Sequence, residues 1–325
     1  MSHAQAELVD KIAAAKERID AVRREVASVY IGSTRTVDHI LVALMARGHV
    51  LLEGVPGVAK TTLAKAFARS LGVQVRRIQF TPDLLPADIT GTYVLSPREG
   101  TFTFRRGPIF ANVVLADEIN RAPPKTQAAL LEAMQEQQVT IEGEGFALPN
   151  PFIVVATQNP IDLEGTYPLP EAQIDRFLVH LSMGYPTRED EVKMLMAHHI
   201  EPAEASPMID ADVVAHLQRL VRSVHVEQDL YEYAVALSEF TRADKRVLLG
   251  ASPRATLGLI QVAKAAAIMG GRGYATPDDL REFAVPVLAH RLVLSDEVDG
   301  ESGAREDIVR MALAQVSYRK AIRPV

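Results

Sequence analysis

The chain of 325 residues carries 35 Lys and Arg against 41 Asp and Glu, a net charge of −6, and 48% of its residues are hydrophobic. This ordinary, slightly acidic composition gives no support for bulk binding to nucleic acid or to an anionic membrane. Its zero cysteines exclude disulfides and thiolate zinc sites and fit a reducing compartment. No run reaches the about 18 apolar residues of a membrane span, and the polar N-terminal segment lacks a secretory core, so we expect a cytoplasmic protein.

Short apolar runs alternate with helical patterns along the first part of the chain. Leu8, Ile12, Ile19 and Val22 recur at helical spacing and predict an amphipathic first helix. Five strands are then predicted, at residues 49–53, 75–80, 113–117, 152–157 and 177–183. Strands that are apolar on both faces and separated by helices are typical of a parallel sheet covered on both sides.

The pattern changes after Tyr185 and Pro186, where no further strand-like run appears. Five helices are predicted, at residues 192–199, 211–221, 230–242, 255–269 and 277–289, the last one after a Thr276 N-cap. We therefore expect an α/β core in residues 1–186 and an all-helical domain in residues 187–325.

A phosphate-binding loop is predicted directly after the first strand. The segment GVPGVAKTT follows that strand and opens a helix, in the order that a P-loop requires. Backbone N–H groups there can cradle phosphate oxygens, while Lys60 reaches the β- and γ-phosphates and Thr61 completes the Mg²⁺ shell. The expected nucleotide-binding residues of this loop are Gly54, Val55, Pro56, Gly57, Val58, Ala59, Lys60, Thr61 and Thr62.

Ala59 stands where the P-loop pattern GxxxxGK[ST] has its second glycine. A methyl group is tolerable there if the residue has helical dihedral angles, because only a positive φ makes glycine necessary. Helical dihedral angles at Ala59 are thus the condition under which this alanine fits without strain.

Two adjacent carboxylates end the third predicted strand, in the segment VVLADE. Beside a P-loop, Asp117 can accept the water shell of Mg²⁺, while Glu118 can polarise an attacking water. Alone, such a pair is also what a strand produces when it leaves the core into a polar turn. Its position downstream of a P-loop, with a strand between, favours the catalytic interpretation.

Three later polar residues have two interpretations each. Asn159 follows a core strand and suits a side chain that holds the nucleophilic water, or it is a turn residue before Pro160. Arg176 suits stabilisation of transition-state charge, or a surface ion pair with Asp175. Arg254, in the first turn of a helix, opposes the helix dipole, which an anion such as ATP would explain if the residue is not an incidental surface arginine.

Taken together, GVPGVAKT, VVLADEINRAPPKTQAALLEAMQE, VVATQNP, YPLPEAQIDRF and GASPRA resemble the MoxR branch of the AAA+ ATPases. They occur in that family's order over residues of about 30 to 260, and residues 117–136 are the most specific element. The resemblance implies a P-loop AAA+ core with a parallel five-stranded sheet and a C-terminal all-helical lid. ATP with Mg²⁺ would bind between them in a ring, usually a hexamer.

The resemblance also implies roles for individual residues. Lys60, Thr61, Asp117 and Glu118 become the nucleotide and catalytic set, with Thr61 and Asp117 at the metal. Arg121 becomes a second interface residue.

For the remaining positions, the resemblance makes Asn159 sensor 1 and Arg254 sensor 2. Arg176 becomes the arginine finger that acts on the neighbouring subunit's ATP. Ile31 and Gly32 resemble the segment that lines the adenine pocket.

An insert in the second core helix is a further feature of the resembling family, and residues 81–107 fit it. Alternating residues at 91–95 and 101–105 predict a hairpin around Pro97 and Gly100. In a ring such an insert faces the pore, so its aromatic and basic residues are candidate substrate contacts, unless the hairpin is only solvated. These residues are Phe102, Phe104, Arg105 and Arg106.

The family's typical function is that of a chaperone-like remodeller or assembly factor, often alongside proteins with von Willebrand factor A-type domains. Two alternatives use the same ATPase core. One is a nucleic-acid translocase or helicase, which the net acidic charge and the lack of a DNA-binding motif disfavour. The other is a chelatase-like insertase motor.

Overall fold

The computed structural model describes residues 3–55, 58–98, 100–159, 165–197, 204–298, 301 and 303–318. Its helices are α1 His3–Val29, α2 Thr34–Met45, α3 Lys60–Ser70, α4 Pro86–Thr90, α5 Pro124–Glu136, α6 Glu171–Ile174, α7 Arg188–Ala197, α8 Ala211–Arg222, α9 Gln228–Ala243, α10 Pro253–Met269, α11 Pro277–Leu288 and α12 Ala304–Gln315. Its strands are β1 Val50–Gly54, β2 Val75–Gln79, β3 Gly91–Ser96, β4 Thr101–Arg106, β5 Val113–Asp117, β6 Gln138–Ile141, β7 Glu144–Ala147, β8 Ile153–Gln158, β9 Val179–Met183, β10 Val247–Leu249 and β11 Val293–Leu294. Among these helices, none is long and apolar enough to cross a membrane.

The five predicted strands form one sheet in the order β2-β5-β8-β1-β9. All neighbouring pairs in it are parallel, which confirms the predicted sheet. Strand β2 is not apolar on both faces, because it lies at the edge of the sheet, and Ile78 is the one residue of β2 that is buried. The exposed positions of this edge strand carry charged and polar side chains, which lie beside the carboxyl end of β5.

Each face of the sheet packs against its own set of helices, so the sheet has two hydrophobic cores. Val50, Leu115 and Val155 face the side that α1, α2, α3 and the C-terminal helices cover. Leu51 and Val154 face the opposite side, where α5 packs. The alternation along each strand is what a doubly covered parallel sheet requires.

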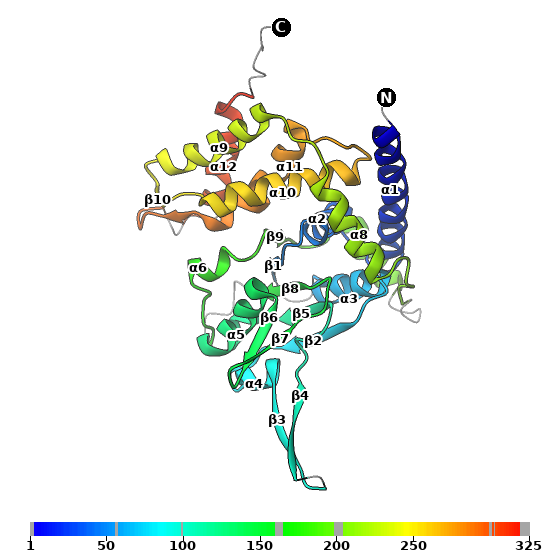
Figure 1. Ribbon diagram of the computed structural model, residues 1–325. Coiled ribbons are helices and arrows are strands. Elements are labelled where there is room, and N and C mark those ends of the chain that lie inside the picture. The colour runs from blue at the N-terminus through cyan, green and yellow to red at the C-terminus, as the bar shows by residue number, and fades with distance from the viewer. Residues whose placement is uncertain are drawn as a thin grey trace.

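The first helix has the predicted amphipathic character. Ile12, Ile19, Val22 and Val26 are buried along one side of α1. This side packs against α3 of the core and against α10 of the C-terminal region, so α1 runs beside both parts of the molecule (Figure 1).

The C-terminal region is helical, as expected, except for a short antiparallel ribbon of β10 and β11. These strands have three and two residues, which is too short for an alternation of apolar and polar residues to be recognised in the sequence. The predicted helices there correspond to α7 to α11, and α12 is an additional helix.

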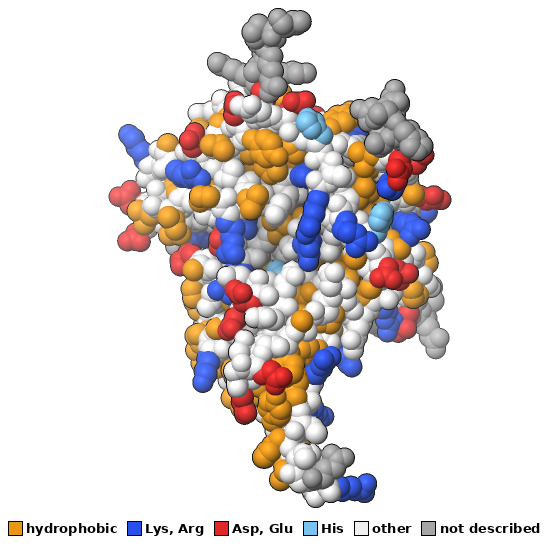
Figure 2. Space-filling model, in the orientation of Figure 1, with side chains coloured by type: hydrophobic (Ala, Val, Ile, Leu, Met, Phe, Trp, Pro, Cys, Tyr) orange, Lys and Arg blue, Asp and Glu red, His pale blue; other side chains and the backbone are white. Residues whose placement is uncertain are grey.

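The predicted insert is a hairpin of β3 and β4 that projects from the body as a narrow arm (Figures 1 and 2). At its base, Phe104 packs against Phe146 of a second hairpin, formed by β6 and β7, with ring centroids 4.4 Å apart. The side chain of Phe104 is therefore engaged in packing rather than offered to a substrate. Phe102, farther along the arm, is 69% exposed, and Arg105 is also exposed.

Candidate nucleotide site

The P-loop and the acidic strand meet at the carboxyl edge of the sheet. Strand β1 ends at Gly54 and α3 begins at Lys60, while β5 ends at Asp117. The Thr61 hydroxyl donates a hydrogen bond to Asp117 Oδ2 at 3.2 Å. Two residues that the sequence assigned to one metal are thus brought into contact.

The connection between β1 and α3 is the predicted phosphate loop. Gly54 must be glycine, because a Cβ there would lie 2.5 Å from the Met183 carbonyl oxygen of β9. Val55 and Val58 flank this loop, and Thr62 lies in the first turn of α3. Pro56 and Gly57, which complete the predicted loop, lie outside the described residues.

Ala59 has φ 60° and ψ 25°, the left-handed conformation. The condition under which an alanine fits here without strain, helical dihedral angles, is therefore not met. The backbone N–H groups at the start of α3 must face the loop, so the backbone reverses direction at Ala59, just before Lys60. Glycine adopts the left-handed conformation of such a reversal at no steric cost. Ala59 carries a methyl group there and is strained.

Lys60 lies across the ends of two central strands. Its Nζ donates to the Gly54 carbonyl of β1 and, at 3.1 Å, to the Gln158 carbonyl of β8. These contacts keep the ammonium group at the mouth of the loop, where it can bind a phosphate as a point charge.

Asp117 is 5% exposed and surrounded by donors. In addition to Thr61, the Thr157 hydroxyl donates to its Oδ1 at 2.8 Å, and Arg77 of β2 donates to its Oδ2 at 2.8 Å. A hydroxyl and a carboxylate oxygen 3.2 Å apart are hard oxygen ligands of the kind that Mg²⁺ prefers, so this donor set fits the ion. Among the described residues, no group of three His, Cys, Asp or Glu side chains forms another metal site.

Glu118 also has a positive φ, 55°. Gln79 of β2 donates to Glu118 Oε2 at 3.0 Å, and Arg121 pairs with the same oxygen at 3.2 Å. The Glu118 backbone N–H donates to the Thr157 hydroxyl at 2.8 Å, which fixes the turn. Each of the two adjacent carboxylates thus has direct donors of its own.

Arg77 and Gln79 are site residues that the sequence reasoning did not single out. Both lie on β2 and are separated by two positions, so they share one face of the strand. The alternation of polar Arg77 and Gln79 with apolar Ile78 and Phe80 was the available signal, because it marks one polar face on this strand.

Asn159 follows β8 directly and is 4% exposed. Its backbone carbonyl accepts a hydrogen bond from the Asn120 amide at 3.2 Å, which places it beside the segment that carries Glu118. The structure thus brings Asn159 to the same edge of the sheet as Lys60.

Arg176 does not form the ion pair with Asp175 that was considered from the sequence. Its Nη1 donates to the Leu131 carbonyl of α5 at 2.6 Å. Asp175 is instead bonded by the buried Arg291, whose Nε lies 2.7 Å from Asp175 Oδ1. Arg291 also donates to the Phe177 carbonyl at 2.7 Å, so the turn that carries Arg176 is held on both sides of it.

Arg254 lies in the first turn of α10, where Ser252 is the N-cap residue. The anionic partner that its position predicted is present within the chain, because Arg254 Nη1 lies 3.8 Å from Asp175 Oδ2. With 51% of its side chain exposed, Arg254 is only loosely held.

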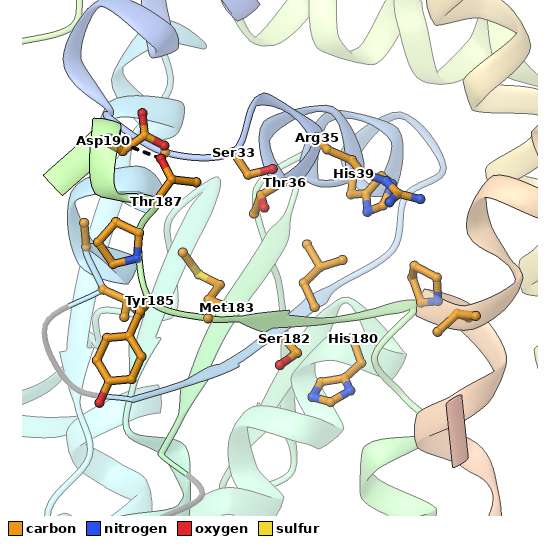
Figure 3. Close-up of a pocket in the computed structure, with 18 of the residues that line it drawn as sticks. Ser33, Arg35, Thr36, His39, His180, Ser182, Met183, Tyr185, Thr187 and Asp190 are labelled. Atoms are coloured by element: carbon orange, nitrogen blue, oxygen red, sulfur yellow. Dashed lines mark hydrogen bonds between the residues drawn. The ribbon is translucent and has the colours of Figure 1, made fainter. Parts of the chain in front are cut away.

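A cavity of about 790 Å³ lies between α2, the end of β9 and the C-terminal helices. Ile31, Gly32, Val58 and Ala59 line it together with Tyr185, so the segment expected to line the adenine pocket and the phosphate loop border the same cavity. Figure 3 shows Ser33, Thr36 and His39 along one side of the cavity and Met183 and Tyr185 along the other.

A neighbouring cavity of about 610 Å³ continues from the loop residues Gly54 and Val55 toward α12. Glu53 and His180 face this cavity and pair at 2.8 Å. The hydrogen bond from His180 lowers the pKa of Glu53 despite its partial burial, so this carboxylate is ionised beside the loop. Glu306 of α12 lines both cavities, a contribution that was not predicted.

Comparisons with known proteins agree with this geometry. Residues 49–179 match the ATPase family associated with various cellular activities (AAA), and residues 239–311 match the AAA lid domain. The chain is 47% identical to the protein YeaC of Bacillus subtilis over 91% of this chain and 94% of YeaC. It is 44% identical to the chaperone MoxR1 of Mycobacterium tuberculosis over 90% of this chain and 81% of MoxR1.

A solved structure has the same fold over nearly the whole length. The crystal structure of a candidate ATPase from Cytophaga hutchinsonii superposes with a TM-score of 0.91 at 37% identity. The superposition covers 98% of this chain and all of that one, including the C-terminal helices.

Proposed function

The chain belongs to the MoxR family of AAA+ ATPases, and on this premise we propose that it hydrolyses ATP to remodel or assemble a protein client. The observation that carries the proposal is the contact between Thr61 and Asp117, with Lys60 at the mouth of the loop between them. This is the arrangement that binds a nucleoside triphosphate with its metal. A Mg²⁺ ion held by Thr61 and Asp117 would supply charge neutralisation between the β- and γ-phosphates.

In the proposed site, Lys60 binds the phosphates and Glu118 accepts the proton of the attacking water. Asn159 orients that water from the end of β8. Arg254 binds the γ-phosphate from the lid, exchanging its loose contact with Asp175 for a phosphate oxygen. The residues around Ile31 and Gly32 bind the base in the larger cavity.

We further propose that the subunits form a ring, and the expected number of subunits is six. In such a ring Arg176 serves the ATP of the next subunit. Support comes from its place on the turn before β9, where Arg291 of the lid holds the backbone on both sides of Arg176. The proposed boundary between core and lid lies near Pro186, between β9 and α7.

We also propose which class of protein is the client. The relative that is named a chaperone matches over most of its length, which favours protein remodelling over nucleic-acid translocation or metal insertion. A protein with a von Willebrand factor A-type domain is the client class that we propose. The exposed Phe102 and Arg105 of the arm would contact it, while Phe104 supports the arm from its base.

The test is steady-state release of phosphate from ATP by purified protein. Glu118→Gln should bind ATP but turn over roughly 10²-fold more slowly or worse, the usual scale for loss of a general base. Glu132→Gln, on the exposed side of α5, is the matched control and should keep the wild-type rate. Wild-type and Glu118→Gln proteins that release phosphate at the same rate would contradict the assignment of Glu118.

A further inference from the structure

Arg77 contacts the carboxylate that the metal would need. The register of the sheet places Arg77 opposite Leu115 and Gln79 opposite Asp117, so both side chains face the end of β5. The Arg77 guanidinium reaches Asp117 Oδ2 with Nε at 2.8 Å and Nη2 at 2.7 Å. Thr61 donates to the same oxygen at 3.2 Å. A single carboxylate oxygen therefore accepts hydrogen bonds from the P-loop helix and from the edge strand.

Arg77 is also connected to the second carboxylate. Its Nη2 donates to Gln79 Oε1 at 2.6 Å, and Gln79 Nε2 donates to Glu118 Oε2 at 3.0 Å. A movement of Arg77 away from Asp117 would withdraw a donor from Gln79 and alter the contact that holds Glu118. The two carboxylates are thus linked through β2 as well as through the chain.

The exposures of the two partners differ. The side chain of Asp117 is 7% exposed, so its charge is costly unless a cation compensates it, whereas that of Arg77 is 48% exposed. Because β2 is an edge strand, a displaced guanidinium can move into solvent at little cost. A cation at Asp117 Oδ2 and a metal ion held through the same carboxylate repel each other, so the two occupancies compete.

We propose that Arg77 is a displaceable counter-ion of Asp117 that competes with Mg²⁺ and sets the metal concentration at which the site loads nucleotide. The inference rests on the proposed nucleotide function, and it concerns a positioning residue rather than a catalytic one. Arg77 neutralises Asp117 until the metal-bound nucleotide arrives, and its departure frees Gln79 from one of its two partners.

The strand itself offers a matched control. Arg76 is exposed and precedes Arg77 directly, so its side chain points to the opposite face of β2. Arg76→Gln and Arg77→Gln change the net charge of the protein equally and at nearly the same place. A difference between them reports the contact with Asp117 rather than the general electrostatic field.

The experiment is a titration of Mg²⁺ at a fixed concentration of the non-hydrolysable analogue adenylyl imidodiphosphate, with the rise in melting temperature as the readout. Arg77→Gln should lower the half-maximal Mg²⁺ concentration by roughly 2- to 10-fold, the size expected for one partly exposed ion pair. Arg76→Gln should leave it at the wild-type value. Arg77→Lys, which keeps the charge and loses the fork, should fall between wild type and Arg77→Gln.

Three results would overturn the inference. The Mg²⁺ requirement of a folded Arg77→Gln variant could stay the same or rise, or Arg76→Gln could shift it by the same factor. The analogue could also fail to stabilise Arg77→Gln in EDTA while it still stabilises the wild type and Arg76→Gln there. That result would show that Arg77 binds phosphate instead. A wild-type protein that the analogue does not stabilise with Mg²⁺ would overturn the nucleotide function first, and is thereby distinguished from these outcomes.

Discussion

The Thr61 hydroxyl donates to Asp117 Oδ2 across 3.2 Å, and this bond joins the first turn of α3 to the end of β5. It spans 56 positions of the chain. Two oxygen atoms of the kind that a magnesium ion prefers are therefore placed together by the fold of the core.

The first prediction follows from that contact. Thr61→Val keeps the branched shape of the side chain and removes the oxygen. We expect the variant to lose most of the Mg²⁺-dependent part of its thermal stabilisation by ATP, because stabilisation follows the affinity of the folded state for its ligand. The part measured in EDTA should remain, since Lys60 is intact. Equal Mg²⁺-dependent stabilisation of variant and wild type would remove Thr61 from the metal site.

Ala59 gives a prediction about stability. An alanine in the left-handed region costs roughly 1–2 kcal/mol, and glycine relieves this at the expense of about 0.4–1 kcal/mol of extra freedom in the unfolded chain. Ala59→Gly should therefore raise the free energy of unfolding by up to about 1.6 kcal/mol.

Ala68→Gly is the control for this change, because Ala68 lies inside α3, where glycine should destabilise the fold by about 1 kcal/mol. Urea unfolding of both variants measures the difference. A destabilised Ala59→Gly variant would show that the methyl group packs too well for the strain to matter.

His49 predicts how stability depends on pH. It is buried, its Nδ1 accepts from the Val154 N–H at 3.0 Å, and Nε2 lies 3.2 Å from the Met134 carbonyl, which places the proton on Nε2. Burial lowers its pKa to about 4. The unfolded chain, with a histidine pKa of about 6.5, therefore takes up a proton first as the pH falls. The resulting stability is present above about pH 6.5 and is lost progressively toward pH 4, by up to roughly 3 kcal/mol.

Urea unfolding between pH 7.5 and pH 4.5 tests this expectation. In His49→Gln the decline should be shallower, because its part of the proton uptake is gone. His290, whose pKa burial also lowers, contributes in the same direction and stays in the variant. Identical slopes for variant and wild type would exclude His49 as a source of the pH dependence.

Much of the core was predictable from local patterns. The five strands, the first helix and the arm follow from runs and alternations that lie within a few residues, and the P-loop and the Asp117–Glu118 pair follow from their spacing. The contacts of Arg77 and Gln79 were not predictable, because they depend on which strand neighbours β5 and in which register. The partner of Arg176 depends in the same way on a residue distant in sequence.

The central claim is that each ATP is hydrolysed between two subunits, with Lys60 from one and Arg176 from the other. Lys60→Ala subunits should not bind ATP but still carry Arg176. Arg176→Ala subunits should fold, bind ATP and hydrolyse it slowly, since an arginine finger contributes roughly 10³- to 10⁵-fold in the best-studied enzymes. Loss of the bond to Leu131 costs the variant one partly buried hydrogen bond, which its melting temperature will show.

The most direct measurement is the ATPase rate of a mixture of these two impaired variants. The rate should rise above the sum of the separate rates, because mixed interfaces combine an intact Lys60 with an intact Arg176. Mass spectrometry of differently tagged subunits establishes that mixed assemblies form. A rate that stays at the sum of the separate rates in such assemblies would contradict hydrolysis at a shared interface.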